Sequence, residues 1–311
     1  MKIIQIGRHR SGNLWLWRII ENVFSKAGIE KKSFIQKQPV YNLIADHWKS
    51  TIEKHNIDTI DIHKNVAFYF DFLPIENMDD YINSVSHVWC HSPYNEGSQK
   101  VLSRFDKIVY IIRDPRDTLV SWARYMFCPI NLKRGVVYDD NPEQYIERNY
   151  RPYIRRWMHH VGQFLCRKDL FRIHFVFYER LLYDFDSELQ RLLNYFDINL
   201  NENDRQIIKE NVSFSSMKTE NPHHLYSGTY GQWLRILTDK QKKEVLRIAK
   251  PMIDLLHYST SEKNTLSYDS NKVPSLPNDI NETQIRKILF RSNRPTFSEV
   301  AERLHKWAVF K

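Results

Sequence analysis

The stretch KIIQIGRHRSGNLWLW at residues 2–17 decides the fold class of this chain. Residues 2–6 are rich in isoleucine and predict a buried strand. Residues 14–27 carry apolar side chains at helical spacing and predict an amphipathic helix. The loop that joins them has Gly7 and Gly12 separated by four residues. A strand, a glycine-bounded loop and a helix in this order predict an α/β fold with a P-loop-like phosphate-binding loop.

The chemistry of this loop favours an anionic ligand. Consecutive backbone N–H groups and the helix N-terminus bind phosphate oxygens, and Arg10 adds a guanidinium that can bind them bidentately. Asn13 and Leu14 stand where a nucleotide triphosphatase has Lys and then Ser or Thr. On its own, the loop also fits an ordinary strand-to-helix turn.

Strand-like and helix-like segments alternate through the rest of the chain. This alternation predicts a three-layer α/β/α fold with a central, mostly parallel sheet covered by helices on both faces. Further strands are expected at residues 66–72, 85–89, 107–112 and 173–177, and further helices at residues 115–122, 142–167, 186–196, 204–211 and 238–257.

A second group of polar residues follows the strand expected at 107–112. Arg113 lies at the carboxyl end of this strand, where ligands collect in open α/β sheets. Asp114 and Pro115 predict the first turn of a helix, which places Ser121 two turns further on. Arg113 and Ser121 could therefore bind one phosphate, although a surface ion pair between Arg113 and Asp114 would explain the same residues.

Composition indicates a globular protein with an anionic partner. The 311 residues are 42% apolar and 27% charged, with a net charge of +9. No block of basic residues resembles a nucleic-acid-binding arm, so we expect no nucleic-acid partner. The three cysteines show no disulfide or metal spacing, and no stretch is apolar enough to span a membrane. We expect a cytoplasmic protein without a membrane or metal partner; the cysteines are Cys90, Cys128 and Cys166.

Several motifs in one order resemble the PAPS-dependent sulfotransferases, in the branch of the cytosolic enzymes and their bacterial relatives. RSGNLWL at residues 10–16 is similar to the family's 5′-phosphosulfate loop, and IRDPRD at 112–117 with Ser121 is similar to its 3′-phosphate motif. The other matching segments are FYERL at 177–181, SFSSMK at 213–218 with NP at 221–222, and GTYGQW at 228–233.

This resemblance implies a donor, PAPS (3′-phosphoadenosine-5′-phosphosulfate), a product, PAP, and no required metal. It also implies a general base, because His91 in CHSP at residues 90–93 stands where relatives carry a histidine. Glu21 is the alternative base. The implied catalytic residues are His91, Arg10 and Ser121, and the implied donor-binding residues are Arg10, Ser11, Gly12, Asn13, Leu14, Trp15, Arg113, Ser121, Tyr178, Phe214, Met217 and Gly228.

The sequence also departs from the family pattern. Asn13 and Leu14 replace two threonines, and Trp89 replaces a lysine two residues before His91. Part of the 3′-phosphate clamp is missing, because Tyr226 and Ser227 stand where relatives have Arg-Lys; Lys218, His223 and His224 are candidates to compensate. The family's dimerisation segment is not kept, which leaves the oligomeric state open; its replaced positions are Leu234, Asp239 and Lys243.

The function expected from the resemblance is sulfuryl transfer from PAPS to a hydroxyl or amine of a small-molecule acceptor. The alternatives are a P-loop nucleotide kinase or hydrolase, a nucleotide-binding protein of this fold without activity, and a basic nucleic-acid-binding module. We expect a catalytic domain at residues 1–258, a polar linker at 259–281 and a short helical extension at 282–311. The acceptor pocket is expected in loops 32–64, 127–149 and 223–226, with Phe34, Tyr41, Trp48, Phe127 and Tyr138 as its aromatic walls and Arg134, Asp139 and Asp140 as its polar groups.

Overall fold

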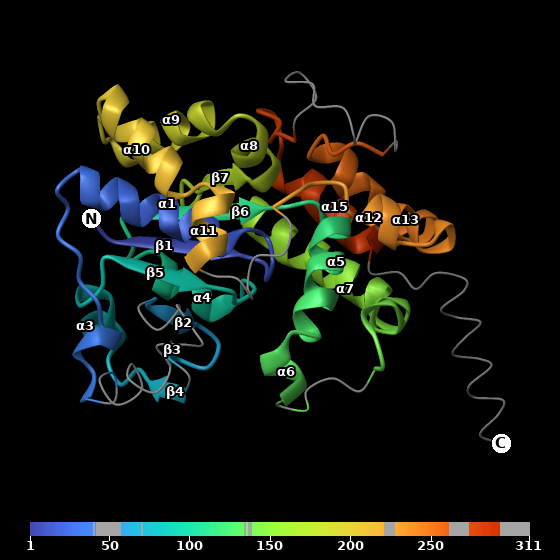
Figure 1. The fold of residues 1–311 in the computed structure, drawn as a ribbon, viewed down its shortest axis with the longest axis horizontal. Coiled ribbons are helices and arrows are strands. Elements are labelled where there is room, and N and C mark those ends of the chain that lie inside the picture. The colour runs from blue at the N-terminus through green and yellow to red at the C-terminus, as the bar shows by residue number, and fades with distance from the viewer. Residues whose placement is uncertain are drawn as a thin grey trace.

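A seven-stranded sheet forms the centre of the molecule (Figure 1). The computed structural model describes residues 1–39, 41, 57–69, 71–133, 135, 139–220, 228–260 and 274–292. The strands are ordered β4-β3-β2-β5-β1-β6-β7 across the sheet. Their bounds are β1 Ile3–Gly7, β2 Thr59–Asp61, β3 Val66–Tyr69, β4 Asp71–Pro74, β5 His87–Cys90, β6 Lys107–Ile112 and β7 His174–Phe177.

The sheet is mostly parallel, as the sequence predicts. Strands β2, β5, β1, β6 and β7 pair in parallel, and antiparallel pairing is confined to β2–β3 and β3–β4 at one edge. The single strand expected at residues 66–72 is wrong. It is a hairpin in which Tyr69 pairs with Asp71, and apolar residues on both sides of the turn make it look continuous in the sequence. Strand β2 was not predicted, because its three residues are too few for a periodic pattern.

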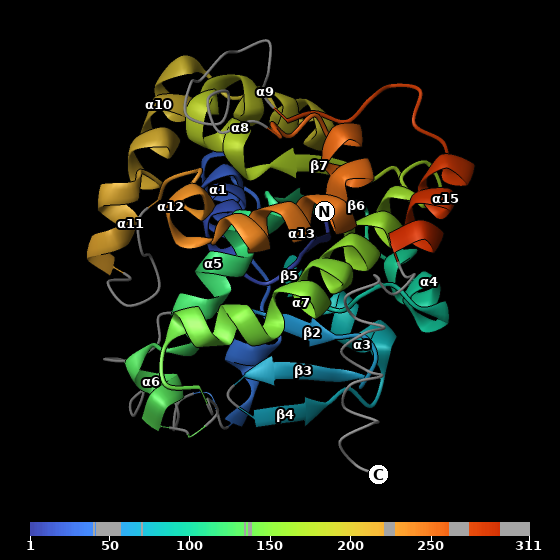
Figure 2. The ribbon, with the colours of Figure 1, turned by 90° about the vertical axis from the view of Figure 1, so that its right-hand side faces the viewer.

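Helices cover both faces of the sheet (Figures 1 and 2). Helix α1 lies on one face, where Leu16, Ile20 and Val23 join a buried cluster with Ile3 and Val109 of the sheet. The longest helix, α7, lies on the opposite face beside α5 and α13. The helices of the two layers are α1 Asn13–Lys26, α9 Phe185–Phe196 and α10 Glu202–Asn211 on one side, and α5 Pro115–Met126, α7 Pro142–Leu165, α13 Asp239–Leu255 and α15 Glu282–Ser292 on the other.

Shorter helices occupy the connections. Helix α8 follows β7 directly, and α11 and α12 flank the segment that leads to α13. None of the helices in the described ranges is long and apolar enough to cross a bilayer. The short helices are η1 Ile35–Lys37, α3 Met78–Asn83, α4 Glu96–Leu102, α6 Pro129–Lys133, α8 Tyr178–Tyr183, α11 Phe214–Glu220 and α12 Trp233–Ile236.

The C-terminal extension packs on the main body as far as the structure describes it. A Cβ atom added to Gly162 of α7 would lie 2.7 Å from Leu289, so α15 sits directly on the glycine. Ile280, in the segment expected to be a linker, is buried, and the Ser275 N–H donates to the Leu256 carbonyl at 3.2 Å. The second expected helix, at residues 296–311, lies outside the described residues.

Candidate active site

The loop between β1 and α1 lies at the carboxyl ends of three neighbouring strands, β5, β1 and β6. Its backbone turns through positive φ at Arg10 (68°) and Gly12 (96°). A side chain at Gly12 would be strained by this φ, and its Cβ would lie 2.6 Å from the ring of Tyr178. Glycine at this position therefore lets the loop and Tyr178 approach each other closely.

Polar atoms in and beside the loop are buried without a hydrogen-bond partner. They include Arg8 Nε, Ser11 Oγ, Asn13 Oδ1 and Arg113 Nε. The rest of Asn13 is fixed, because its Nδ2 donates to the Arg8 carbonyl at 2.7 Å and its own carbonyl accepts from Gln5 Nε2 at 2.7 Å. Buried polar groups are nearly always hydrogen-bonded, so these atoms fit a polar ligand in the loop.

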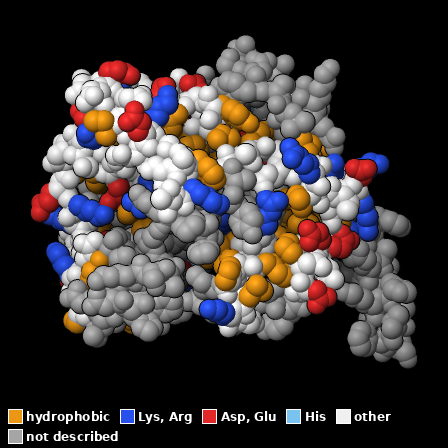
Figure 3. Space-filling view, viewed as in Figure 1, with side chains coloured by type: hydrophobic (Ala, Val, Ile, Leu, Met, Phe, Trp, Pro, Cys, Tyr) orange, Lys and Arg blue, Asp and Glu red, His pale blue; other side chains and the backbone are white. Residues whose placement is uncertain are grey.

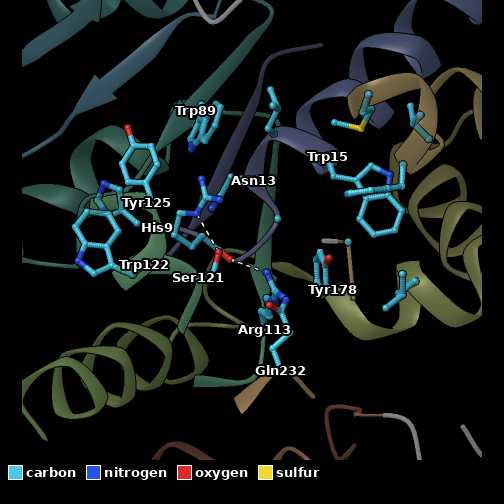
Figure 4. A pocket seen from close by; sticks show the side chains of 18 of the residues that line it. His9, Asn13, Trp15, Trp89, Arg113, Ser121, Trp122, Tyr125, Tyr178 and Gln232 are labelled. Atoms are coloured by element: carbon cyan, nitrogen blue, oxygen red, sulfur yellow. Dashed lines mark hydrogen bonds between the residues drawn. The ribbon is translucent and has the colours of Figure 1, made fainter. Parts of the chain in front are cut away.

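Arg10, Arg113 and Ser121 meet although they lie more than a hundred residues apart. Arg10 Nε donates to Ser121 Oγ at 3.1 Å, and Arg113 Nη1 donates to the Arg10 carbonyl at 3.2 Å (Figure 4). The Arg113 guanidinium also lies 4.0 Å from the ring centroid of Tyr178. Burial and the nearby Arg113 lower the pKa of Arg10 to about 10. Two guanidinium groups that line the same pocket create a field that favours an anion.

These residues border one pocket with two distinct ends (Figure 4). Trp15 and Tyr178 border one end, and Phe214 and Met217 also line the pocket. His9, Trp89, Trp122 and Tyr125 border the other end, and Ser121 lies between the two ends. The full set of described lining residues contains no carboxylate: His9, Arg10, Gly12, Asn13, Leu14, Trp15, Trp89, His91, Arg113, Ser121, Trp122, Tyr125, Tyr178, Leu182, Val212, Phe214, Met217, Gly228 and Gln232.

His91 also lines this pocket, and a backbone carbonyl sets its orientation. Its Nδ1 lies 2.6 Å from the Gly7 carbonyl oxygen. Because a carbonyl only accepts, Nδ1 carries the proton, and in the neutral ring Nε2 is left as the basic nitrogen. The ring stacks on His9 at 3.9 Å between centroids and meets Trp89 edge-on at 5.2 Å.

A buried polar network beneath the pocket joins the motif segments. Asp114, the N-cap of α5, forms a fully buried ion pair with Arg116 at 2.6 Å, and its backbone N–H donates to Glu179 Oε1 at 2.9 Å. Asp117 accepts from the backbone N–H of Gly231 at 2.7 Å and from that of Trp233 at 3.1 Å. This network fixes the positions of the neighbouring pocket residues, which are Arg113, Tyr178 and Gly228.

The structure brings the predicted site residues together. All of them line the pocket except Ser11, which is buried in the loop beside it. Glu21, the alternative base, does not line the pocket and instead pairs with His87 and Lys31, which keep its pKa below the usual range despite burial. The expected clamp and compensating residues at 221–227 lie outside the described residues.

The aromatic residues expected around the acceptor are not among the described residues that line this pocket. Phe34, Tyr41 and Phe127 do not line the pocket, while Trp48 and Tyr138 lie outside the described residues. Sequence reasoning missed His9, Trp122 and Tyr125 as pocket residues. Their positions next to the motif residues are the signal that would have found them. His9 directly precedes Arg10, Trp122 directly follows Ser121, and Tyr125 lies one helical turn after Ser121.

The family model for the sulfotransferase domain matches residues 1–256. The chain belongs to the sulfotransferase family. Among curated sulfotransferases, the amine sulfotransferase of Oryctolagus cuniculus is 23% identical over 128 residues, which cover 41% of this chain and 42% of the relative. Sulfotransferase 2A6 of Mus musculus is 25% identical over 135 residues, which cover 42% of this chain and 45% of the relative. The matches thus span less than half the length of these curated sulfotransferases.

Solved sulfotransferase structures share the fold over a longer span. Mouse sulfotransferase SULT7A1, complexed with PAP, matches with a TM-score of 0.55 at 20% identity and covers 80% of this chain and 82% of its own. Retinol dehydratase, in a complex with retinol and PAP, matches with a TM-score of 0.55 at 17% identity, covering 81% of each chain. At these identities the likeness shows the fold of the sulfotransferases alone.

Proposed function

We propose that this chain is a PAPS-dependent sulfotransferase that transfers a sulfuryl group to a hydroxyl or amine of a small-molecule acceptor. One observation carries the proposal: Arg10, Arg113 and Ser121 are joined at the strand ends of a pocket whose described lining has no carboxylate. Such a site favours a ligand with several negative charges. Figure 3 shows Lys and Arg side chains across the middle of the face that it draws, next to hydrophobic ones.

The residues present fit the donor at both of its charged ends. The backbone N–H groups of residues 11–13, with Arg10, would hold the 5′-phosphosulfate, and Arg113 with Ser121 would hold the 3′-phosphate. The Ser11 hydroxyl and the Arg113 Nε would gain the partners that they lack. PAPS supplies the sulfuryl group, and its adenine ring would lie near four aromatic and apolar side chains of the pocket, Trp15, Tyr178, Phe214 and Met217.

The chemistry assigned to the chain's own residues is acid–base and electrostatic. As the acceptor atom bonds to sulfur, the bond from sulfur to the phosphate oxygen breaks and its electron pair remains on that oxygen. Arg10 stabilises the negative charge that develops there. The proton of the acceptor passes to Nε2 of His91, whose Nδ1–H is held by the Gly7 carbonyl.

Selective nucleotide binding tests the donor assignment. We expect adenosine 3′,5′-bisphosphate to raise the unfolding temperature of the protein well above the value with adenosine 2′,5′-bisphosphate, AMP or ATP at equal concentration. A ligand at about a hundredfold its dissociation constant adds about 2.7 kcal/mol to the folded state. The 2′,5′ isomer has the same charge, so it separates recognition of the 3′-phosphate from general attraction of anions.

Two variants test which side chains recognise the 3′-phosphate. Ser121→Ala and Arg113→Lys should reduce the advantage of the 3′,5′ isomer, because both side chains are assigned to the 3′-phosphate. Equal stabilisation by both isomers in the unmodified protein would contradict the donor assignment. Selective binding without sulfation of any acceptor would instead favour a nucleotide-binding protein of this fold.

A further inference from the structure

Gln232 lines the pocket but has no role in the proposed donor site. It belongs to segment 228–233, which leads into helix α12. The Thr229 carbonyl in this segment accepts from Arg113 Nη2 at 3.1 Å, and Arg113 is the arginine assigned to the 3′-phosphate. Gln232 is therefore part of a segment that is joined directly to the proposed phosphate site.

One face of α5 holds this segment in place. Asp117 accepts from the backbone N–H groups of the two residues that flank Gln232. Seven residues further along the helix, Arg124 Nη1 donates to Oε1 of Gln232. Positions seven apart share one face of a helix, and Ser121 lies between them on that face, four residues after Asp117. The helix therefore fixes both the backbone and the side chain of Gln232 on the face that carries Ser121.

The bond from Arg124 also sets the direction of the Gln232 amide. A guanidinium group only donates hydrogen bonds, so the atom that it meets is the amide oxygen, and the NH₂ group forms the other branch. An amide oxygen would repel a phosphate, whereas an NH₂ group can donate to it. The orientation that Arg124 imposes thus makes Gln232 a donor suited to an anion.

We propose that the amide of Gln232 is a further ligand of the 3′-phosphate and that Arg124 is a positioning residue that orients this amide. The inference rests on the proposed function and adds a residue that determines its specificity for the donor. The 3′-phosphate is then bound by Arg113 after β6, Ser121 in α5 and Gln232 before α12, and all three line one pocket (Figure 4).

Isomeric nucleotides test the role of Gln232. Calorimetry on the full chain gives the affinities of adenosine 3′,5′-bisphosphate and adenosine 2′,5′-bisphosphate, and their ratio is the selectivity for a 3′-phosphate. Gln232→Met keeps the length of the side chain and removes the NH₂ group. We expect it to lower the selectivity about tenfold, the effect of losing a hydrogen bond to a charged group, and to leave the affinity for AMP unchanged.

A second variant and a matched control accompany this measurement. Gln232→Glu keeps an acceptor for Arg124 but replaces the NH₂ group with a negatively charged oxygen, so it should lower the selectivity further than Gln232→Met does. The control is Gln190→Met on α9, because Oε1 of Gln190 also accepts from an arginine, Arg205, outside the pocket lining. This control should leave the selectivity unchanged.

Variants of Arg124 separate position from charge. Arg124→Leu should lower the selectivity several-fold, and Arg124→Lys, which can still donate to Oε1 of Gln232, should restore most of it. The two isomers carry the same charge, so a general loss of attraction for anions weakens both and cancels in the ratio. If Arg124 acts through Gln232, adding Arg124→Leu to Gln232→Met should lower the selectivity no further.

Selectivity that survives both Gln232→Met and Gln232→Glu overturns the proposal. An equal loss of affinity for both isomers also overturns it, because the amide would then bind a part of the nucleotide that the isomers share. The unmodified protein separates these failures from that of the donor site. If it selects the 3′,5′ isomer, only the role of Gln232 is wrong; if it binds both isomers alike, the donor assignment itself fails.

Discussion

His91 is held by a backbone carbonyl instead of a carboxylate. The Gly7 carbonyl accepts from Nδ1–H and so fixes the tautomer without adding a negative charge beside the ring. The carbonyl of His91 itself lies 3.1 Å from Nε2 of His160, whose pKa burial lowers to about 3, so this second ring is neutral near pH 7. Both contacts position the His91 ring through neutral groups.

His91→Asn separates orientation from basicity. The asparagine amide can still donate to the Gly7 carbonyl, but it offers no basic nitrogen. If His91 is the base, turnover should fall by about 10²- to 10⁴-fold, the usual contribution of a general base, while PAP affinity is unchanged. Steady-state kinetics and calorimetric titration with PAP measure the two quantities.

Turnover close to that of the unmodified protein would remove His91 from the mechanism. A parallel loss of PAP affinity would instead assign His91 to the shape of the loop.

At the scale of elements, α7 supports the site from behind the sheet. The indole N–H of its fully buried Trp157 donates to the Arg113 carbonyl at 3.1 Å, and its His160 contacts the carbonyl of His91. The same helix carries α15 on its outer face, where Leu289 lies over Gly162. The C-terminal extension therefore packs on the helix that contacts the backbone carbonyls of Arg113 and His91, the residues that follow β6 and β5.

Gly162→Ala should destabilise the protein. The new methyl group would lie 2.7 Å from Leu289, and overpacking of this kind costs about 1–3 kcal/mol. Gly162→Ala combined with Leu289→Ala should recover part of the loss, because the shorter side chain makes room. Urea unfolding of both single variants and the double variant gives the coupling energy.

Gly97→Ala is the matched control, since its Cβ would only touch Asn95 Oδ1 at 3.4 Å on an exposed turn of α4. Additive effects of Gly162→Ala and Leu289→Ala would mean that α15 does not rest on α7 in solution.

The elements that the sequence predicted are those with long periodic patterns. Strand β6 has the expected bounds, and α1, α9 and α13 differ from expectation by only a few residues. The hairpin at β3 and β4 and the three-residue β2 were missed, because pairing with neighbouring strands defines them and no local pattern does. Short helices such as α8 were missed for the same reason: six residues are too few for a period to be recognised.

The residues of the site also divide into those that the sequence predicted and those that it missed. Residues in ordered motifs, such as Arg10 and Arg113, were found because the motifs fix their place at strand ends. Trp122 and Tyr125 were not found, because their place in the pocket depends on which face of α5 turns toward the loop. Cytoplasmic location and the absence of nucleic-acid partners stay predictions, and the oligomeric state stays open.

At the scale of the whole molecule, Glu179 connects segments from three parts of the chain. It follows β7 in the first turn of α8, accepts from the Asp114 N–H at the start of α5, and accepts from the Tyr258 hydroxyl at 3.1 Å beyond α13. Burial is the main reason that its pKa rises to about 8, and the nearby Asp114 raises it further. The folded protein therefore binds a proton at Glu179 that the unfolded chain releases at lower pH.

The sign of the resulting pH dependence follows directly. Between the ordinary pKa of 4.5 and the folded value of about 8, the folded state holds more protons at Glu179 than the unfolded state does. The stability that this group contributes is thus fully present below about pH 4.5 and is lost as the pH rises toward 8. One proton corresponds to a slope of at most about 1.4 kcal/mol per pH unit.

Glu179→Gln should remove this slope. The amide oxygen can still accept from the Asp114 N–H, and its NH₂ group can donate to the Tyr258 oxygen as the protonated acid would. Unfolding free energies from urea titrations at pH 5, 6, 7 and 8 should fall with pH in the unmodified protein and be flatter in Glu179→Gln. Asp117, whose pKa burial raises to about 6, adds a slope of the same sign below that pH in both proteins.

The exposed Glu202→Gln is the control and should keep the full slope. Parallel curves for Glu179→Gln and the unmodified protein would mean that Glu179 is ionised in the folded state, and Arg113, which lies close enough to act on its pKa, would then be its counterion.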